Sequence, residues 1–259
     1  MQASSIRMDW KAVESVRSLN PDVVFYIGAN IGPYALKWTA LKEIRVISKI
    51  VNLCSDAADR PWHNVLFVYK KHECFDLQVS LDGSRPESIG LASLTPVDAS
   101  VFEGESNRDI RCGFSGSSGG RRSEIINALS WFGNLTVRHR EANDGYENHV
   151  KFMKRCSMVL NTSWTGSGMA HHVKGRVLEA GWAGCALLEY HESPIREWFP
   201  EDCYFIWKDA KEAANIIKDA SDEEISRRAK RLSEEVRNRF TAKSIYGEIL
   251  RKLNVDIAI

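Results

Sequence analysis

Short apolar runs alternate with amphipathic segments along the first part of the chain. Asp22 to Ile27 reads DVVFYI, and Ile50 to Cys54 and Phe75 to Leu81 are further runs rich in β-branched and aromatic residues. Continuous apolar runs of this kind are typical of parallel strands buried on both faces. A helix capped by Asp9 is predicted before the first of these runs, and another from Ala35 to Ile44 lies between the first and the second. This alternation predicts a doubly wound α/β fold.

The same pattern begins again after a polar stretch from Thr95 to Arg108. Five more strands are predicted after it, at Ile110 to Phe114, Leu135 to Arg138, Met158 to Leu160, Cys185 to Leu188 and Cys203 to Ile206. We therefore predict two Rossmann-like domains facing a cleft, 1–100 and 101–240, with the N-terminal domain short. Residues 241–259 are predicted to form a C-terminal helix that packs back across the domains.

The segment from Lys174 to Glu189 combines a helix of small residues with a following apolar strand. Lys174 and Arg176 are predicted in the first turn of this helix, where cations are unfavourable unless an anion is bound. Glu179 has two open interpretations. It either accepts hydrogen bonds from the paired hydroxyls of a ligand or is a solvated carboxylate paired with one of these two cations.

Ser115 to Arg122, SGSSGGRR, links a predicted strand to a predicted helix. The glycines of this loop let backbone N–H groups approach an anion without a Cβ in the way, so it is the best phosphate cradle in the sequence. A flexible turn with solvated arginines is the alternative. The glycines of Gly28 to Pro33 are a weaker signal of the same kind, and a tight turn explains them better.

Polar side chains follow the second predicted strand. Asp56, Asp59 and His63 lie where parallel sheets place their ligands, so they are candidates for a base or a substrate-holding group. Helix capping by the aspartates and a surface histidine are the alternative explanation.

Composition narrows the classes of function. The chain has 259 residues, 35 basic and 34 acidic, so no global charge attracts nucleic acid or an anionic membrane. Six cysteines are scattered singly in mostly apolar runs, which favours buried reduced thiols. The N-terminus has no apolar signal core and no apolar run reaches membrane-spanning length. We expect a cytoplasmic protein without a membrane span.

Residues 175–217, GRVLEAGWAGCALLEYHESPIREWFPEDCYFIWKDAKEAANII, resemble the donor-binding half of GT-B glycosyltransferases of the group-1 and CgeB-like type. The shared pattern is a helix with R-x-F/L-E-A-x-x-x-G, an apolar strand, and a strand followed by Asp and a helix rich in Glu and Ala. Ser115 to Arg122 resembles the loop after the first strand of that half, and Thr95 to Phe102 resembles its interdomain P-x-D-x-x-x-F segment.

The resemblance implies a nucleoside diphosphate sugar donor held by the C-terminal half. Glu179 would bind the ribose hydroxyls, and the diphosphate would lie near a set of polar and basic residues. That set is Ser115, Gly116, Arg121, Lys174 and Arg176. The acceptor would be a glycan or another hydroxyl compound, so a role in polysaccharide synthesis is expected. No Asp-x-Asp motif is present, and no metal or cofactor is expected.

Two features depart from the resemblance. Many retaining members carry a second glutamate eight positions before the one matching Glu179, where this chain has His171. If the reaction inverts, Asp56 or Asp59 is the expected base, and His171 is a further candidate for contact with the sugar. The short first half is compatible with a piece of a longer enzyme. A nucleotide-sugar epimerase and a non-catalytic binding module remain alternatives.

Overall fold

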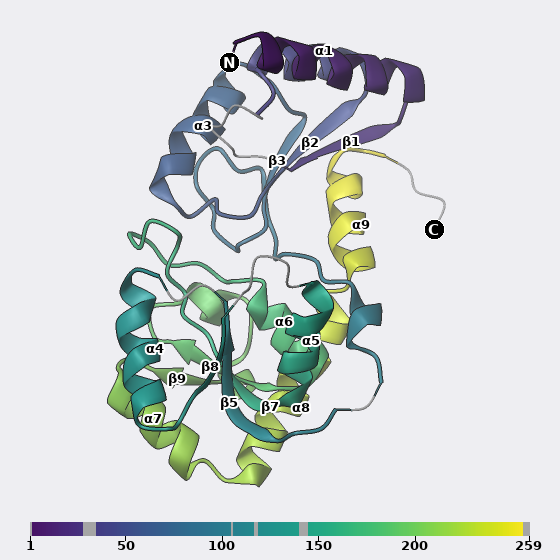
Figure 1. Cartoon of the computed structure of the whole chain (residues 1–259). Coiled ribbons are helices and arrows are strands. Elements are labelled where there is room, and N and C mark those ends of the chain that lie inside the picture. Colours follow the sequence, from purple (N-terminus) through teal and green to yellow (C-terminus); the bar gives the residue numbers. More distant parts are fainter. Residues whose placement is uncertain (1, 28–34, 105, 117–118, 140–144, 256–259) are drawn as a thin grey trace. The chain divides into compact units, whose positions relative to one another are not determined.

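A computed structural model describes residues 2–27, 35–104, 106–116, 119–139 and 145–255 (Figure 1). The chain divides into two compact units, one made of Met1–Ser93 with Ile245–Ile259 and the other of Leu94–Ser244. The glycine loop predicted at Gly28 to Pro33 lies outside the described residues.

The N-terminal unit contains a parallel four-stranded sheet with the order β1-β2-β3-β4. Its elements are α1 (Gln2–Leu19), β1 (Val23–Ile27), α2 (Trp38–Ile47), β2 (Lys49–Cys54), α3 (Arg60–Lys71), β3 (Leu77–Ser80) and β4 (Leu91–Ala92). The amphipathic helices cover the apolar strand β2, whose residues after Lys49 are all buried. The strand and helix alternation predicted for this half is therefore confirmed.

Two details of the N-terminal prediction are wrong. β1 is the edge strand of its sheet rather than a strand buried on both faces, and Phe25 and Ile27 are 37% and 77% exposed. Asp9 does not begin a helix, because α1 already starts at Gln2; its carboxylate instead accepts a hydrogen bond of 3.1 Å from the backbone N–H of Lys37.

The last helix, α9 (Ala242–Lys252), belongs mostly to the N-terminal unit. Tyr246 on α9 meets Phe25 of β1 edge to face, with ring centroids 5.4 Å apart. Ile245, Ile249 and Leu253 recur at helical spacing and are buried, as the sequence pattern predicts.

The C-terminal unit contains a parallel five-stranded sheet with the order β6-β5-β7-β8-β9. Its strands are β5 (Ile110–Ser115), β6 (Thr136–Arg138), β7 (Cys156–Leu160), β8 (Ala186–Tyr190) and β9 (Tyr204–Trp207). Its helices are α4 (Arg121–Trp131), α5 (Tyr146–Arg155), α6 (Arg176–Ala183), α7 (Ala210–Asp219) and α8 (Asp222–Arg239). Short 3₁₀ turns lie at Ala99–Phe102, Pro194–Glu197 and Glu201–Cys203. Figure 1 shows α4 and α7 on one side of this sheet and α5 and α6 on the other.

Two capping residues start the helices that close this unit. The side chain of Asp209 accepts a hydrogen bond from the N–H of Glu212, and Ser221 accepts one from Glu224. Both pairs have the spacing of a capping box. The predicted apolar stripe of α8 is also confirmed, since Ile225, Ala229, Leu232, Val236 and Phe240 are buried.

All six cysteines are free and buried, as their apolar surroundings predict. Burial raises the pKa of Cys112 to about 12 and that of Cys185 to about 11, so these thiols stay protonated at neutral pH.

Gly181 lets α6 pack closely against α8. A Cβ placed on Gly181 would lie 2.5 Å from Cγ2 of Val236 and 3.4 Å from the carbonyl oxygen of Leu232. Gly184 ends the helix in the left-handed conformation, at φ 68°, which favours glycine. The small residues of this segment therefore serve helix packing and termination.

We predict that Gly181→Ala lowers the free energy of unfolding by about 1–3 kcal/mol, because the added methyl group overpacks the contact with Val236. Denaturant unfolding measures this. Gly247→Ala on α9 is the matched control: a Cβ there meets nothing within 4 Å of the described atoms, so it should stabilise by about 0.4–1 kcal/mol. Equal effects at the two sites would contradict the packing argument.

Candidate functional site

The carboxyl edge of the five-stranded sheet gathers polar side chains from several strands. Ser115 ends β5 and pairs in register with Arg138 at the end of β6. Asn161 follows β7 directly, and Glu189 lies near the end of β8. Because parallel strands end at the same edge, residues distant in sequence meet there.

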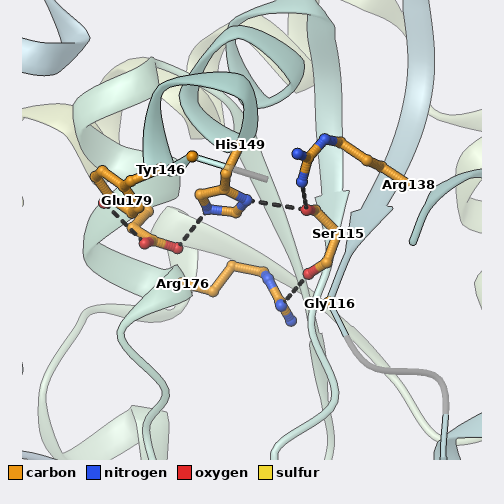
Figure 2. Close-up of a pocket in the computed structure, with 8 residues that line it drawn as sticks. Ser115, Gly116, Arg138, Tyr146, His149, Arg176 and Glu179 are labelled. Carbon is orange, nitrogen blue, oxygen red and sulfur yellow. Dashed lines mark hydrogen bonds and ion pairs between the residues drawn. The ribbon is translucent and has the colours of Figure 1, made fainter. Parts of the chain in front are cut away.

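A cavity of about 290 Å³ opens at this edge (Figure 2). It is lined by residues from the ends of two strands and from two helices. They are Ser115, Gly116, Arg138, Gly145, Tyr146, His149, Arg176 and Glu179.

Glu179, in the first turn of α6, is the anionic group of this cavity. The Tyr146 hydroxyl donates a hydrogen bond of 2.9 Å to Oε1, and His149 Nε2 lies 3.0 Å from Oε2. The side chain is only 17% exposed, and burial alone would raise its pKa. The contacts with His149 and Tyr146 and the charge of Arg176 outweigh burial and hold the pKa below its usual value. Glu179 is therefore ionised at neutral pH.

A continuous chain of hydrogen bonds leads to this carboxylate. Arg138 Nη1 donates to Ser115 Oγ over 3.2 Å, and this oxygen lies 2.9 Å from His149 Nδ1. Figure 2 shows the imidazole between Ser115 and Glu179. An arginine can only donate and an ionised carboxylate can only accept, and Ser115 Oγ can accept from Arg138 while it also bonds to His149 Nδ1, so every link is satisfied with Nε2 donating to Glu179. The chain thus orients the His149 ring.

Arg176 braces the ends of β5 and β7. Its guanidinium donates to the carbonyl oxygen of Ser115 and, over 3.2 Å, to Asn161 Oδ1. It also lies over the Phe114 ring, 4.9 Å from the centroid. Burial lowers its pKa, yet arginine stays charged at neutral pH. Protein acceptors therefore already engage the cation that the sequence pattern assigned to a bound phosphate.

Asn161 connects Arg176 to a second buried acid. Its Nδ2 donates a hydrogen bond of 2.7 Å to Glu189 Oε2, and both residues are 0% exposed. Burial raises the pKa of Glu189 to about 7, even though Asn161 donates to its charged form.

The structure brings together four of the predicted donor residues around the cavity: Ser115, Gly116, Arg176 and Glu179. Arg121 and Lys174 are not among the described residues that line the cavity. Arg121 is exposed at the start of α4, and Lys174 precedes α6 instead of lying in its first turn. Residues 117–118 of the predicted phosphate loop lie outside the described residues.

His171 lies on a hairpin that crosses from β7 to α6. Its Nδ1 is 2.8 Å from Ser163 Oγ, and its Nε2 is 2.9 Å from Glu192 Oε2. The ring also stacks on Tyr190 at a centroid distance of 5.4 Å. Burial lowers its pKa and outweighs the nearby Glu192 charge, so the imidazole is neutral at pH 7.

Asp56 and Asp59 lie in the N-terminal unit, after the carboxyl end of β2. Asp59 occupies the N-cap position of α3 and is 4% exposed, while Asp56 is partly exposed. Their role as a base stays a prediction.

Sequence reasoning missed two polar members of the cavity lining, Arg138 and His149. A signal for them exists. Arg138 ends an apolar run where ligand residues of parallel sheets lie, and Tyr146 and His149 are three residues apart after Gly145, which places them on one face of a helix start.

Comparison with known proteins decides the family. A family model described as "Glycosyl transferase-like" matches residues 105–251, more than half of the chain. The chain belongs to this glycosyl transferase-like family.

Several solved structures are similar in fold to this family member. HepE of Anabaena, solved with UDP and glucose, has a TM-score of 0.65 at 15% identity, covering 95% of this chain and 81% of its own. A glycosyltransferase of Rickettsia africae scores 0.62 at 8% identity, covering 95% and 79%. An α,α-trehalose-phosphate synthase (UDP-forming) of Burkholderia vietnamiensis scores 0.61 at 10% identity, covering 98% and 75%. With the two parallel sheets, these matches confirm the predicted GT-B fold.

No curated protein sequence matches the chain. Within the described residues, no helix is long and apolar enough to cross a membrane.

The raised pKa of Glu189 predicts that the stability of this glycosyl transferase-like protein depends on pH. Its pKa of about 7 when folded is above its usual 4.5, so the folded chain binds the proton more tightly than the unfolded chain. The free energy of unfolding should therefore fall as pH rises from about 4.5 to 7, by up to about 3 kcal/mol, and this component should vanish in Glu189→Gln. Urea unfolding across this pH range measures it.

Glu197→Gln, at an exposed position in the 3₁₀ turn Pro194–Glu197 that follows β8, is the control and should keep the wild-type pH dependence. An unchanged pH dependence in Glu189→Gln would show that Glu189 is not held with a raised pKa.

Proposed function

We propose that the protein transfers a sugar from a UDP-sugar donor to an acceptor hydroxyl, and that the cavity beside Glu179 holds the nucleoside of the donor. Membership of the glycosyl transferase-like family supports the reaction class. The neighbouring structure HepE, solved with UDP-glucose, supports the choice of donor. A glycan is the acceptor class we favour.

The main support for this proposal is the ionised carboxylate of Glu179, which faces the cavity and can accept further hydrogen bonds. A carboxylate offers about four acceptor positions, and Tyr146 and His149 occupy one on each oxygen of Glu179. The remaining positions suit two hydroxyl donors held side by side, which is the pattern of a ribose 2′,3′-diol. The lowered pKa keeps this acceptor charged at neutral pH.

The other lining residues suit a pyrimidine with carbonyl groups. Tyr146 leaves 46% of its surface exposed, which offers a ring for stacking. Arg138 contributes N–H donors that match carbonyl oxygens such as those of uracil.

In the proposed reaction the bond from the anomeric carbon to the diphosphate oxygen breaks, and a bond from that carbon to the acceptor oxygen forms. The protein lowers the barrier by orienting the two substrates and by stabilising the charge that develops on the diphosphate. Arg176, Lys174 and Arg121 are the cations proposed for that stabilisation, in place of a metal ion. If the reaction inverts, Asp56 or Asp59 takes the acceptor proton, and His171 contacts the sugar.

The alternatives are a nucleotide-sugar epimerase of the same fold and a non-catalytic binding module. An epimerase would alter the sugar of its donor without an acceptor, and a module would bind nucleotide without turnover. Product analysis with and without acceptor therefore separates the three.

We predict that Glu179→Gln weakens UDP binding by about tenfold or more, because an amide replaces a charged acceptor. The variant should also lose the preference of the wild-type protein for UDP over 2′-deoxy-UDP. Isothermal titration calorimetry of both ligands measures this. Glu197→Gln is the matched control and should bind UDP like the wild-type protein. Unchanged UDP affinity in Glu179→Gln would refute the ribose assignment.

We predict that UDP is released from a UDP-sugar only when an acceptor is present, and that a chelator leaves the rate unchanged. The physical reason for the second part is that protein cations carry the diphosphate charge. A screen of UDP-sugars against glycan acceptors, followed by mass spectrometry, measures both. A rate that disappears with chelator and returns with magnesium would contradict the metal-independent mechanism.

A further inference from the structure

Two buried polar residues lie next to the cavity without belonging to its described lining. Asn161 follows β7 and Glu189 lies on β8, and both are 0% exposed. The function proposed above gives neither of them a role. Burying a charged carboxylate away from water is unfavourable in free energy unless hydrogen-bond partners and opposite charges offset it. The presence of Glu189 at this edge therefore needs an explanation.

The amide of Asn161 links the Arg176 cation to the Glu189 anion, with its oxygen towards Arg176 and its nitrogen towards Glu189. Arg176 Nη1 donates to Oδ1 over 3.2 Å, and Nδ2 donates to Glu189 Oε2 over 2.7 Å. Arginine has no acceptor and an ionised carboxylate has no donor, so only one orientation of the amide satisfies both. The amide oxygen of Asn161 therefore faces Arg176, and the ionised Glu189 carboxylate holds the amide nitrogen on the other side.

The other end of Arg176 touches the wall of the cavity. Its Nη2 donates to the carbonyl oxygen of Ser115. The next residue, Gly116, has φ 146°, and a Cβ placed on it would lie 2.8 Å from Nη2 of Arg176. The guanidinium thus packs directly against backbone that lines the cavity, and its position determines where that backbone can lie.

We propose that Glu189 is a positioning residue of the nucleotide site, which acts through Asn161 to hold the Arg176 guanidinium against the Ser115–Gly116 backbone. The consequence for ligand affinity rests on the function proposed above. The consequence for the backbone does not.

Several groups act on Glu189 electrostatically. Lys174, before α6, and Arg176 both favour its ionised form, and Tyr204 of β9 is a neutral neighbour. Burial is the stronger influence and raises the pKa of Glu189 to about 7. Protonation weakens the charge-assisted hydrogen bond that Asn161 donates to Glu189, so the network should loosen as pH falls from 8 to 6.

The first test uses the nucleotide-free protein. In ¹⁵N-glycine-labelled protein, the Gly116 amide resonance should shift with pH with a midpoint near 7, and Glu189→Gln should abolish this midpoint. A Gly116 resonance that titrates identically in Glu189→Gln would overturn the proposal, as would one that does not titrate in the wild-type protein.

The second test measures UDP-glucose affinity by calorimetry at pH 6, 7 and 8. This ligand has no group that titrates in that range. Glu189→Gln and Asn161→Ala should each lower the affinity about tenfold at pH 8, and the double variant should be no weaker than Asn161→Ala. Additive losses would show that Glu189 does not act through Asn161.

A charge swap separates positioning from simple loss of stability. In Asn161→Asp with Glu189→Gln, the new carboxylate can accept directly from Arg176 and the new amide can donate to it, so affinity at pH 8 should recover to within about threefold of the wild-type value. Its pH dependence between 6 and 8 should be lost, because a carboxylate paired with arginine stays ionised. No recovery in a folded swap variant would contradict the proposal.

Asp82→Asn is the control for a buried acid elsewhere. Asp82 is 1% exposed in the N-terminal unit and accepts hydrogen bonds from Ser80 and Ser84. This variant should lose stability and keep UDP-glucose affinity. If the wild-type protein binds no UDP-glucose at any pH, the proposed function fails, and the Gly116 titration still decides the positioning role.

Discussion

Two opposite charges on one turn of α6, Arg176 and Glu179, control the arrangement of the site. Both lie in a poorly solvated place, so each requires partners from other elements. Glu179 takes Tyr146 and His149 from α5, and Arg176 takes Ser115 from β5 and Asn161 from the end of β7. Satisfying these two side chains ties a helix and two strand ends to α6, which leaves a preformed cavity between them.

Local sequence patterns predicted the fold well, because apolar runs and capping residues report on their own elements. The caps Asp209 and Ser221 and the stripe of α8 are examples. The prediction failed where context decides. The apolar run of β1 is equally compatible with a central or an edge strand, and α1 continues past Asp9 to Gln2, so a residue that can cap a helix does not start one here.

The site was predictable only in part. Glu179, Arg176, Ser115 and Gly116 were selected because a helix start and a strand end are legible in the sequence, and they do line one cavity. Their partners were not predictable in the same way. The sequence offered Lys174 or Arg176 as the partner of Glu179, whereas the partners are His149 and Tyr146, thirty or more residues away in the chain. Pairing of that kind follows from the register of parallel strands, which no local pattern specifies.

The most direct test is a structure of the protein with UDP. We expect the nucleoside to occupy the cavity at the carboxyl edge of the five-stranded sheet, with the ribose 2′- and 3′-hydroxyls within hydrogen-bonding distance of Glu179 and the diphosphate towards Gly116 and the start of α6. UDP bound at another surface, or a ribose that does not contact Glu179, would show that this cavity is not the nucleoside site.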